Sequence, residues 1–268
     1  MSDEQLRAID LIFFDIDDTF SGGNGQHRIL SEAYDALWRL HSAGVRVVPV
    51  TGRPAGWCDM IARMWPVAAV VGENGAFYCR VETGKHGGPS KFIKTYLESQ
   101  AVREKNAKRL KLLHKSLKKK FKGVQTASDQ GYREFDLAID CYEDVKPWSK
   151  KRVDELLAYC RSKGAIAKLS SIHVNTWFGK YDKLSCVKLV LKKLSAQGVF
   201  ENSKNVVYIG DSPNDEPFFE KFGLSVGVAN VERFLESMQY HPTYITAQAS
   251  GMGFTEFANR VIAARKAK

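Results

Sequence analysis

Short apolar runs alternate with helical patterns along the first eighty residues. The runs lie at residues 11–16, 45–51 and 68–75. Short, largely apolar runs of this kind are typical of strands that a parallel sheet buries on both faces. The same rhythm returns near the C-terminal end, at residues 206–211, 224–230 and 243–246. The pattern predicts an α/β fold, with a doubly wound, Rossmann-like parallel sheet and right-handed crossovers.

The helix expected over residues 30–44 carries signals at both ends. Ser31 is expected to be its N-cap, and Gly44 is expected to follow its last turn at the C′ position. Leu37 and Leu40 fall on one face at helical spacing. We expect that face to pack on the sheet.

The pattern changes between residues 81 and 178. A glycine-rich break, "TGKHGGPS", precedes a lysine-rich helical segment, and residues 132–140 and 171–177 alternate between apolar and polar side chains. Alternation is typical of antiparallel sheets with one buried face. We therefore expect a core domain formed by residues 1–80 and 179–268, interrupted by an inserted α+β cap domain over residues 81–178.

Period two places the polar side chains of these two segments on common faces. They are Tyr132, Glu134 and Asp136 in the first segment, and Ser171, His173, Asn175 and Trp177 in the second. The opposite faces are expected to pack on the cap helices. The polar faces suit a solvated surface as well as a roof over a substrate. We favour the roof, so Glu134, Asp136, His173 and Asn175 become candidate substrate-binding residues.

The composition is that of an ordinary globular protein, with 44% hydrophobic and 26% charged residues, but the net charge is +10 and the pI is near 9.3. Much of the excess lies in "VREKNAKRLKLLHKSLKKKFKG", where Leu110, Leu113, Leu117 and Phe121 recur at helical spacing. This predicts an amphipathic helix with a basic outer face. A solvated face is favoured over a nucleic-acid interface, because no stacking set of aromatic residues accompanies the charge.

Cysteine usage and the N-terminal residues bear on the cellular compartment. The five cysteines are widely spaced without a CxxC pair, which argues against a disulfide framework and a thiolate zinc site. Residues 1–10 have neither a signal-peptide nor a transit-peptide composition, and no apolar run approaches the length of a membrane span. We expect a cytoplasmic protein without a membrane partner.

Acidic residues follow two of the predicted strands. Asp15, Asp17 and Asp18 come directly after the first apolar run, where such a cluster needs a cation, a shared proton or solvent to offset repulsion. An acidic turn is the structural alternative. The run at residues 206–211 ends in Asp211, and Asp215 follows in the loop. If these strands are neighbours, the carboxylates of Asp15, Asp17, Asp211 and Asp215 meet at one edge as hard oxygen ligands for Mg²⁺.

Further polar groups are expected at the same edge. Thr51 ends the second strand with a hydroxyl, and Lys183 supplies a positive charge just before a helical pattern. A carboxylate nucleophile, a metal, a hydroxyl and a lysine together suit phosphoryl transfer, because the lysine and the metal would neutralise charge on the transferring oxygens. Arg53 either contacts substrate or pairs with a loop carboxylate. Asn74 either faces the site or fills a left-handed turn position.

The order of these motifs resembles that of the haloacid dehalogenase superfamily of phosphohydrolases. Its pattern DxDx[TV] is matched by Asp15, Asp17 and Thr19, and its later motifs by Thr51, Lys183 and "GDSPND". The middle segment is similar to the type IIB cap of Cof-like and sugar-phosphate phosphatases. One departure is Asp18, where many relatives carry glycine or another small residue.

The resemblance implies a two-step hydrolysis. Asp15 would attack the phosphorus and form an aspartyl-phosphate, and Asp17 would act first as acid and then as base. Thr51 and Lys183 would bind the phosphoryl oxygens, with assistance from Asn214. The resemblance also implies Mg²⁺ held by Asp15, by the Asp17 backbone carbonyl and by Asp211, with Asp215 supporting the ligands.

The substrate is expected to be the phosphate monoester of a small metabolite. Asn, His and carboxylate side chains beside a Trp suit a polyhydroxylated molecule, so a sugar phosphate is the leading expectation. Two alternatives remain open: a phosphomutase that uses the same aspartate pair, and a non-catalytic nucleic-acid-binding protein on the same fold.

Overall fold

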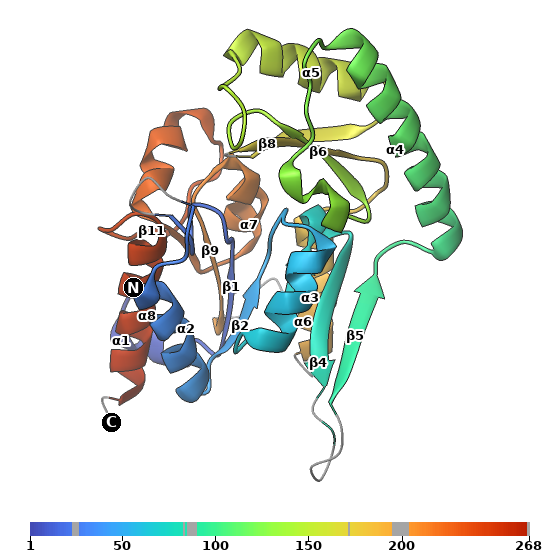
Figure 1. Ribbon diagram of the computed structural model, residues 1–268. Helices are drawn as coiled ribbons and strands as arrows, with labels where there is room; N and C mark the ends of the chain where they lie inside the picture. The colour runs from blue at the N-terminus through green and yellow to red at the C-terminus, as the bar shows by residue number, and fades with distance from the viewer. Residues whose placement is uncertain (23–26, 83, 85–89, 171, 195–203, 267–268) are drawn as a thin grey trace.

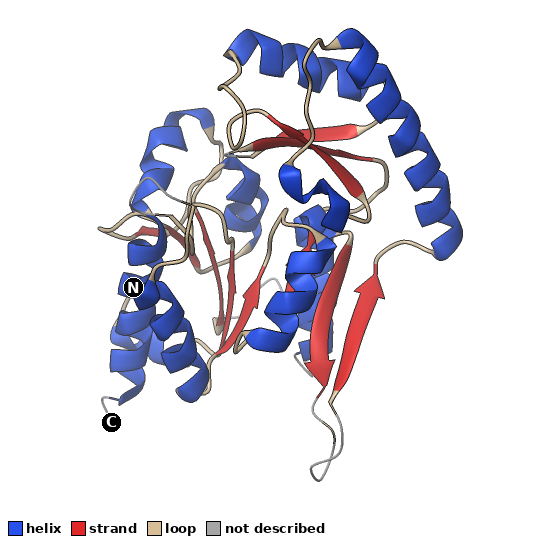
Figure 2. Cartoon of the chain, viewed as in Figure 1, coloured by secondary structure: helices blue, strands red, loops and turns tan. Residues whose placement is uncertain are grey.

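A computed structural model describes residues 1–22, 27–82, 84, 90–170, 172–194 and 204–266. Figure 1 shows two bodies, a larger one that contains both chain ends and a smaller one above it. In each body helices pack on a sheet (Figure 2). Within the described residues, no helix combines the length and the apolar character needed to cross a membrane.

The larger body, the core, is built on a five-stranded parallel sheet with the order β11-β10-β9-β1-β2. The strands are β1 (Leu11–Phe14), β2 (Arg46–Pro49), β9 (Val206–Gly210), β10 (Ser225–Gly227) and β11 (Tyr244–Ile245). In β1, which lies between β9 and β2, Phe13 lies opposite Val48 of β2 and Tyr208 of β9. The sheet confirms the α/β expectation and places the strands that precede Asp15 and Asp211 side by side.

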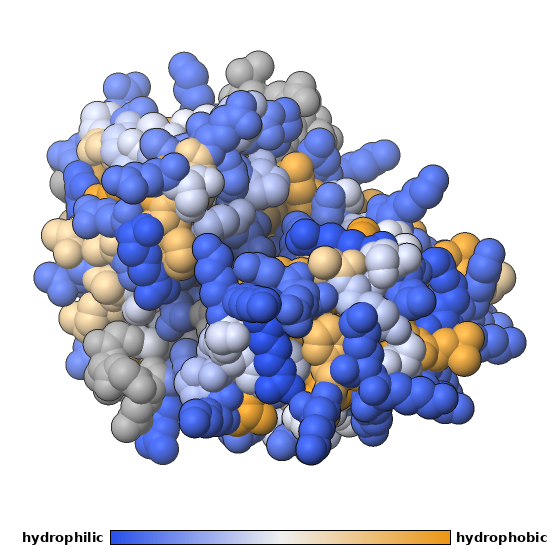
Figure 3. Space-filling model, turned by 90° about the horizontal axis from the view of Figure 1, so that it is seen from above, coloured by the Kyte–Doolittle hydropathy of each residue, from blue (hydrophilic) through white to orange (hydrophobic). Residues whose placement is uncertain are grey.

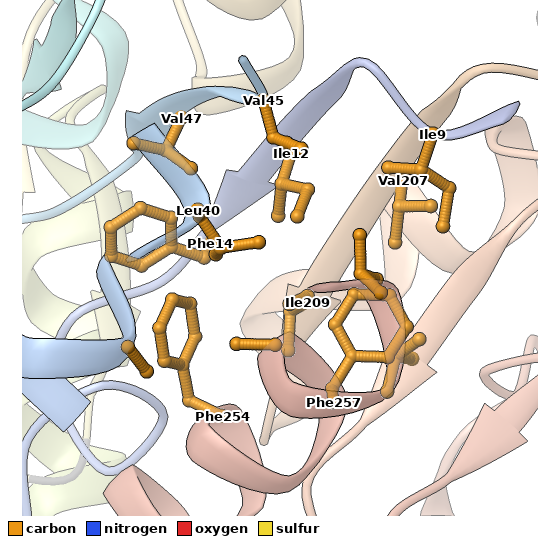
Figure 4. Close-up of a cluster of buried hydrophobic side chains, with 14 of the residues drawn as sticks. Ile9, Ile12, Phe14, Leu40, Val45, Val47, Val207, Ile209, Phe254 and Phe257 are labelled. Atoms are coloured by element: carbon orange, nitrogen blue, oxygen red, sulfur yellow. The ribbon is translucent and has the colours of Figure 1, made fainter. Parts of the chain in front are cut away.

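Helices cover both faces of this sheet. On one face lie α1 (Asp3–Ala8), α2 (Ser31–Ser42) and α8 (Ser250–Lys266), and on the other lie α6 (Lys183–Leu194) and α7 (Glu216–Lys221). Ile12 and Phe14 face the first group (Figure 4), whereas Leu11 and Phe13 face the second. Each such side chain removed from water stabilises the fold by about 1.5–3 kcal/mol. Burial on both faces therefore explains the unbroken apolar run.

Helix α2 confirms the helix expected over residues 30–44, but the predicted N-cap is wrong. Leu30 holds the N-cap position without a side-chain hydrogen bond, and Ser31 is the first helical residue, whose hydroxyl donates to Glu32. Leu37 and Leu40 are buried as expected. Gly44 follows with a φ of +77°, the left-handed conformation expected of a C′ residue.

A three-stranded sheet with the order β3-β4-β5 adjoins the core. It consists of β3 (Val70–Gly72), β4 (Phe77–Glu82) and β5 (Lys91–Tyr96), flanked by α3 (Ala55–Met64). A parallel bridge between Val50 and Val71 connects it to the end of β2. Because β4 and β5 pair in series with β3, this hairpin extends from the core. The division of the chain at residues 81 and 178 stays a prediction.

The turn η1 (Glu73–Gly75) reverses the chain between β3 and β4. Gly75 has a φ of +98°, and a Cβ at this position would lie 2.1 Å from the carbonyl oxygen of Asp182. Only glycine therefore lets the turn approach the start of α6, where Lys183 lies.

The smaller body, the cap, contains an antiparallel sheet with the order β6-β8-β7. Its elements are α4 (Gln100–Lys120), η3 (Ser128–Tyr132), β6 (Asp136–Asp140), α5 (Lys150–Ser162), β7 (Ile166–Leu169) and β8 (His173–Trp177). Helices α4 and α5 pack on one face of the sheet through an apolar cluster that includes Leu113, Leu117 and Phe121. These residues lie where the helical spacing predicted them.

One expectation for the cap strands is wrong. Residues 128–132 form a 3₁₀ helix, so the strand begins only at Asp136, and Tyr132 is 63% exposed. Every residue of β6 and β8 is buried, so neither face of these two strands is the solvated surface that was the alternative to the roof. The helices cover one face and the core lies against the other. Only the edge strand β7 leaves most of its residues exposed.

Candidate active site

A cavity of about 320 Å³ lies between the carboxyl edge of the parallel sheet and the cap. Nine of the predicted site residues line it: Asp15, Asp17, Arg53, Asn74, His173, Asn175, Lys183, Asp211 and Asn214. They come from segments up to two hundred residues apart in the chain. The fold therefore gathers most of the predicted residues around one space.

Asp15 and Lys183 form a buried ion pair at the floor of this cavity. The Nζ of Lys183 donates to Oδ1 of Asp15 at 3.0 Å. The backbone N–H of Asp15 donates to Ile209 of the neighbouring strand, which fixes the position of the carboxylate. Burial raises the pKa of Asp15 to about 7, against the lowering effect of Lys183, and the nearby Asp215 and Asp17 add to the rise. A further cation at this edge would favour the ionised form of Asp15.

Three carboxylates at this edge lie close enough to share a metal ion. Oxygen atoms of Asp15, Asp211 and Asp215 all lie within 4.8 Å of one another, and all three residues are buried. Burial, with the charges of Asp215 and Asp15, raises the pKa of Asp211 well above its usual range. Thr19 donates to Oδ1 of Asp211 at 3.1 Å, and Asn230 donates to Oδ2 at 3.2 Å. The donor set consists of hard oxygens, which fits Mg²⁺.

Asp215 differs from the other two carboxylates, because its own oxygens are already engaged. Oδ1 accepts from the Tyr208 hydroxyl at 2.5 Å, and Oδ2 accepts from the backbone N–H groups of Asp211 at 3.0 Å and Ser212 at 3.3 Å. Asp215 therefore holds the Asp211 loop in place. It does not line the cavity that Asp15 and Asp211 line.

Asp17 is bound by an arginine. The Nε and Nη2 atoms of Arg53 donate to Oδ1 of Asp17 at 2.9 and 2.7 Å. The same guanidinium lies 3.7 Å from Asp129 and 3.5 Å from Glu143, both in the cap. Its carbon lies 4.5 Å from the ring centroid of Trp57. Arg53 was expected either to contact substrate or to pair with a loop carboxylate. The structure shows the pairing, and one of the paired carboxylates is that of Asp17.

Thr51 and Asn74 belong to the loops beneath the cap. Thr51 is fully buried, and its hydroxyl accepts the backbone N–H of Arg53 at 3.0 Å, so it stabilises the loop rather than lining the cavity. Asn74 was expected either to face the site or to fill a left-handed turn position, and it does both. Its φ of 57° is left-handed, and its side chain lines the cavity while donating to Asp136 at 3.1 Å.

Asp18 also has a left-handed backbone, with a φ of 57°. Glycine adopts this conformation without strain, whereas Asp tolerates it at some cost. The backbone carbonyl of Asp18 accepts a hydrogen bond from Asn230, which also contacts Asp211. The position therefore shapes the loop that carries Asp15 and Asp17.

The cap contributes His173 and Asn175 to the cavity from β8. The Nε2 of His173 lies 2.9 Å from Oε2 of Glu143. Asn175 is 5% exposed, and its Oδ1 has no hydrogen-bond partner among the described residues. Trp177 on the same strand stacks on Tyr181 and is buried in apolar surroundings. Ser171, predicted on the same face, lies outside the described residues.

The other two cap candidates are directed elsewhere. Glu134 pairs with Lys94 at the surface, 2.5 Å away. Asp136 is buried and pairs with Arg133 at 2.9 Å. Neither lines the cavity. Glu134 lies before β6, because the 3₁₀ helix delays the start of the strand. Asp136 is the first residue of β6 and lies opposite Trp177 of β8. Asn214 lines the cavity and donates to the Leu169 carbonyl of the cap at 3.0 Å.

Sequence reasoning missed the residues that bind the cap to the core. The buried Glu73 carboxylate accepts backbone N–H groups of residues 134–136 in the cap and of Ala55 in the core. Arg133 of the cap donates to the Gly52 carbonyl at 2.9 Å. Glu73 could have been noticed from the sequence, because it is a charged residue directly after the apolar run of β3. Nothing in the local pattern marks Arg133.

The doubly wound core, the inserted cap and the aspartate–lysine pair beneath it define the class of capped phosphohydrolases. A family model of haloacid dehalogenase-like hydrolases matches residues 12–103 and 92–251. The chain belongs to this family, and it is a phosphoric monoester hydrolase of the haloacid dehalogenase type.

Two similar proteins span nearly the same length as this chain. The phosphoglycolate phosphatase of Methanobrevibacter smithii is 26% identical over 258 residues, which is 95% of this chain and 99% of the relative. Phosphoglycolate phosphatase 1 of Saccharolobus solfataricus is 23% identical over 255 residues, which is 95% of this chain and 96% of the relative.

Solved structures share the fold at lower identity. A Thermoplasma acidophilum protein has a TM-score of 0.69 at 16% identity and covers 94% of this chain and 98% of its own. The sucrose-phosphatase of Synechocystis, solved with sucrose and phosphate, has a TM-score of 0.62 at 15% identity and covers 95% and 98%. The likeness extends over both the core and the cap.

Proposed function

We propose that the chain is a Mg²⁺-dependent phosphatase that hydrolyses a small phosphate monoester through an aspartyl-phosphate on Asp15. The observation that carries the proposal is the buried Asp15–Lys183 pair, 3.0 Å apart, on the floor of a cavity closed by the cap. Asp15 can approach a phosphorus atom in the cavity. Lys183 can neutralise the phosphoryl oxygens at the same time.

In the first step an Asp15 oxygen forms a bond to phosphorus, and the bond between phosphorus and the ester oxygen breaks. Asp17 gives a proton to the departing oxygen. In the second step Asp17 takes a proton from water, whose oxygen attacks the aspartyl-phosphate and releases phosphate. Asp17 has to carry a proton when the ester binds, and the pairing with Arg53 keeps its side chain at the cavity.

Asp15 and Asp211 are the side chains that would hold Mg²⁺, together with the backbone carbonyl of Asp17, while Asp215 supports Asp211. When bound, Mg²⁺ supplies positive charge that offsets the carboxylates and the charge on the phosphoryl oxygens. Thr51 remains a candidate for the phosphoryl oxygens through its loop, and Asn214 remains one through its side chain.

Removal of metal tests this assignment. Phosphate release should stop with EDTA and return with Mg²⁺, whereas Ca²⁺ should substitute poorly because its coordination is larger and looser. Mg²⁺ should also raise the melting temperature of the wild type, but not that of Asp211→Asn. Full turnover by metal-stripped protein would refute the metal site.

A sugar phosphate is the substrate class that the cap residues support best. The Oδ1 of Asn175 is buried without a partner among the described residues, and a buried acceptor of this kind needs a donor. A substrate hydroxyl would supply it. His173 and Asn74 add polar groups beside it, and the volume of about 320 Å³ is at the small end of ligand sites.

A phosphorylated small carboxylate is the second candidate. Arg233 of η5 (Ala229–Ser237) lines the cavity, and its guanidinium forms no ion pair with any described residue. It could pair with a substrate carboxylate. Both similar proteins reported above are named phosphoglycolate phosphatases, which supports this candidate.

A screen of phosphorylated metabolites for phosphate release with Mg²⁺ present would decide between them. Asn175→Ala and His173→Ala should lower kcat/KM for the best sugar phosphate about tenfold or more, because each loses a hydrogen bond to substrate. Hydrolysis of p-nitrophenyl phosphate should change much less. Arg233→Met is the matched variant, which should impair only a carboxylated substrate.

Three outcomes would count against the proposal. If the cap variants treat natural and artificial substrates alike at wild-type rates, the cap face does not select the substrate. If phosphate returns to a sugar instead of appearing free, the enzyme is a phosphomutase. If no phosphate ester reacts, the proposed activity is wrong.

A further inference from the structure

The positive charge of the chain is concentrated on two helices of the cap. Residues 100–122 contain ten Lys or Arg and one Glu, and residues 150–163 contain five Lys or Arg and two acidic residues. Together they hold a charge of +12, so the remainder of the chain carries −2 against the total of +10. The basic pI is therefore a property of α4 and α5 and not of the whole surface.

Six of the seven lysines of α4 form a row along one side of the helix, which we call the lysine face. Its members are Lys105, Lys108, Lys111, Lys115, Lys118 and Lys119, all exposed. Each lies three or four residues from another member, and the row spans about 21 Å at 1.5 Å per residue. None of the ion pairs among the described residues includes them. A linear row of unpaired cations suits a linear polyanion.

The lysine face lies on the side of the cap that is remote from the cavity. The opposite side of α4, with Leu113 and Leu117, packs on the cap sheet, and the other face of that sheet covers the cavity. Figure 3 looks down on the molecule from the cap side, where hydrophilic residues cover most of the surface. A partner bound here would not compete with a phosphate ester for the active site.

We propose that the lysine face binds the phosphate backbone of double-stranded nucleic acid. A membrane surface fits less well, because an interfacial helix needs a broad free apolar side, whereas Leu113 and Leu117 of α4 are buried and Leu112 is the large apolar residue exposed among the lysines. Single strands are bound largely by stacking on aromatic rings. Here Lys120 and Lys163 cover the Tyr159 ring, and Arg152 covers Trp148. Backbone contacts alone imply little preference for sequence.

Fluorescence anisotropy of a labelled DNA duplex of about 24 base pairs, titrated with the full chain at about 50, 100 and 200 mM salt, tests the proposal. The wild type should bind, with an affinity that falls steeply as salt rises. The variant K108Q/K111Q/K115Q should bind at least about tenfold more weakly and lower the logarithmic salt slope by roughly 2–3, at about 0.9 for each lost phosphate contact.

The matched control removes the same charge from the core. K192Q/K193Q/K204Q changes three exposed lysines at or beyond the end of α6 and should bind the duplex within about twofold of the wild type. Both variants should keep the circular dichroism spectrum and the activity toward the small phosphate ester.

Three results would overturn the proposal. The first is absence of duplex binding by folded wild type at low salt. The second is equal weakening in both variants, which would mean that only total charge matters. The third is displacement of the duplex by polyglutamate as effectively as by unlabelled duplex, which would make the face a site for acidic proteins.

Discussion

Glu143 shows how a single cap residue is connected to the catalytic loop. Its Oε1 lies 3.5 Å from Arg53, and its Oε2 lies 2.9 Å from His173. The backbone N–H of Glu143 donates to Asp140 at 2.9 Å, which holds the turn in position. The contact with His173, and then the charge of Arg53, lower the pKa of Glu143 to about 2.

Because the pKa of Glu143 is lower in the folded protein, its ionised form stabilises the fold above pH 4.5, and this contribution is lost as the pH falls toward 2. Glu143→Gln should reduce the free energy of unfolding by roughly 1–2 kcal/mol near pH 7, since the side chain is partly exposed and screened.

Urea unfolding of wild type and variant at several pH values between about 7 and 3 checks this expectation. The difference in the free energy of unfolding between the two proteins should shrink below pH 4.5, which is the ordinary pKa of a glutamate. A difference that stays constant with pH would show that the charge of Glu143 contributes nothing.

At the scale of elements, the turn η1 joins the core to the start of β6. The Glu73 carboxylate accepts the N–H groups of Glu134, Phe135 and Asp136 at 2.9, 2.6 and 3.1 Å, and the N–H of Ala55 at the start of α3 at 2.9 Å. One side chain therefore satisfies four backbone donors on two elements.

Glu73→Ala should lower the free energy of unfolding by about 3 kcal/mol or more, because four buried or half-buried N–H groups lose their acceptor. Glu73→Gln is the matched variant, since it keeps one oxygen acceptor and nearly the same volume, and it should lose less. Denaturant unfolding of both variants measures the difference. An alanine variant as stable as the glutamine variant would show that these hydrogen bonds do not hold the cap.

The same turn shows where prediction from sequence works and where it fails. The apolar run of β1 was predictable, because burial on both faces leaves a continuous apolar stretch. The apolar side of α2 was predictable, because burial of one face leaves apolar residues at helical spacing. The strand start at Asp136 was not, because Glu73, more than sixty residues earlier, fixes the backbone of residues 134–136. Period two therefore assigned Glu134 to the roof, whereas Glu134 pairs with Lys94.

At the scale of the whole molecule, the site is assembled at the boundary between core and cap. Arg53 of the core faces Asp129 and Glu143 of the cap, Arg133 of the cap binds Gly52, and Asn214 binds Leu169. The aspartates of the core half could be predicted because Asp15 and Asp211 directly follow buried strands. The cap half could be predicted only in part, because its partners depend on contacts between distant segments.

The central claim is the covalent intermediate on Asp15, and rapid quenching with a phosphate-labelled substrate tests it most directly. The account predicts an acid-stable, hydroxylamine-sensitive phosphoryl group that peptide mapping places on Asp15 and that persists longer in Asp17→Asn. Asp15→Asn should keep the fold, trap no label and release no phosphate. Appreciable turnover by Asp15→Asn protein free of wild-type contamination, or label on another residue, would contradict the account.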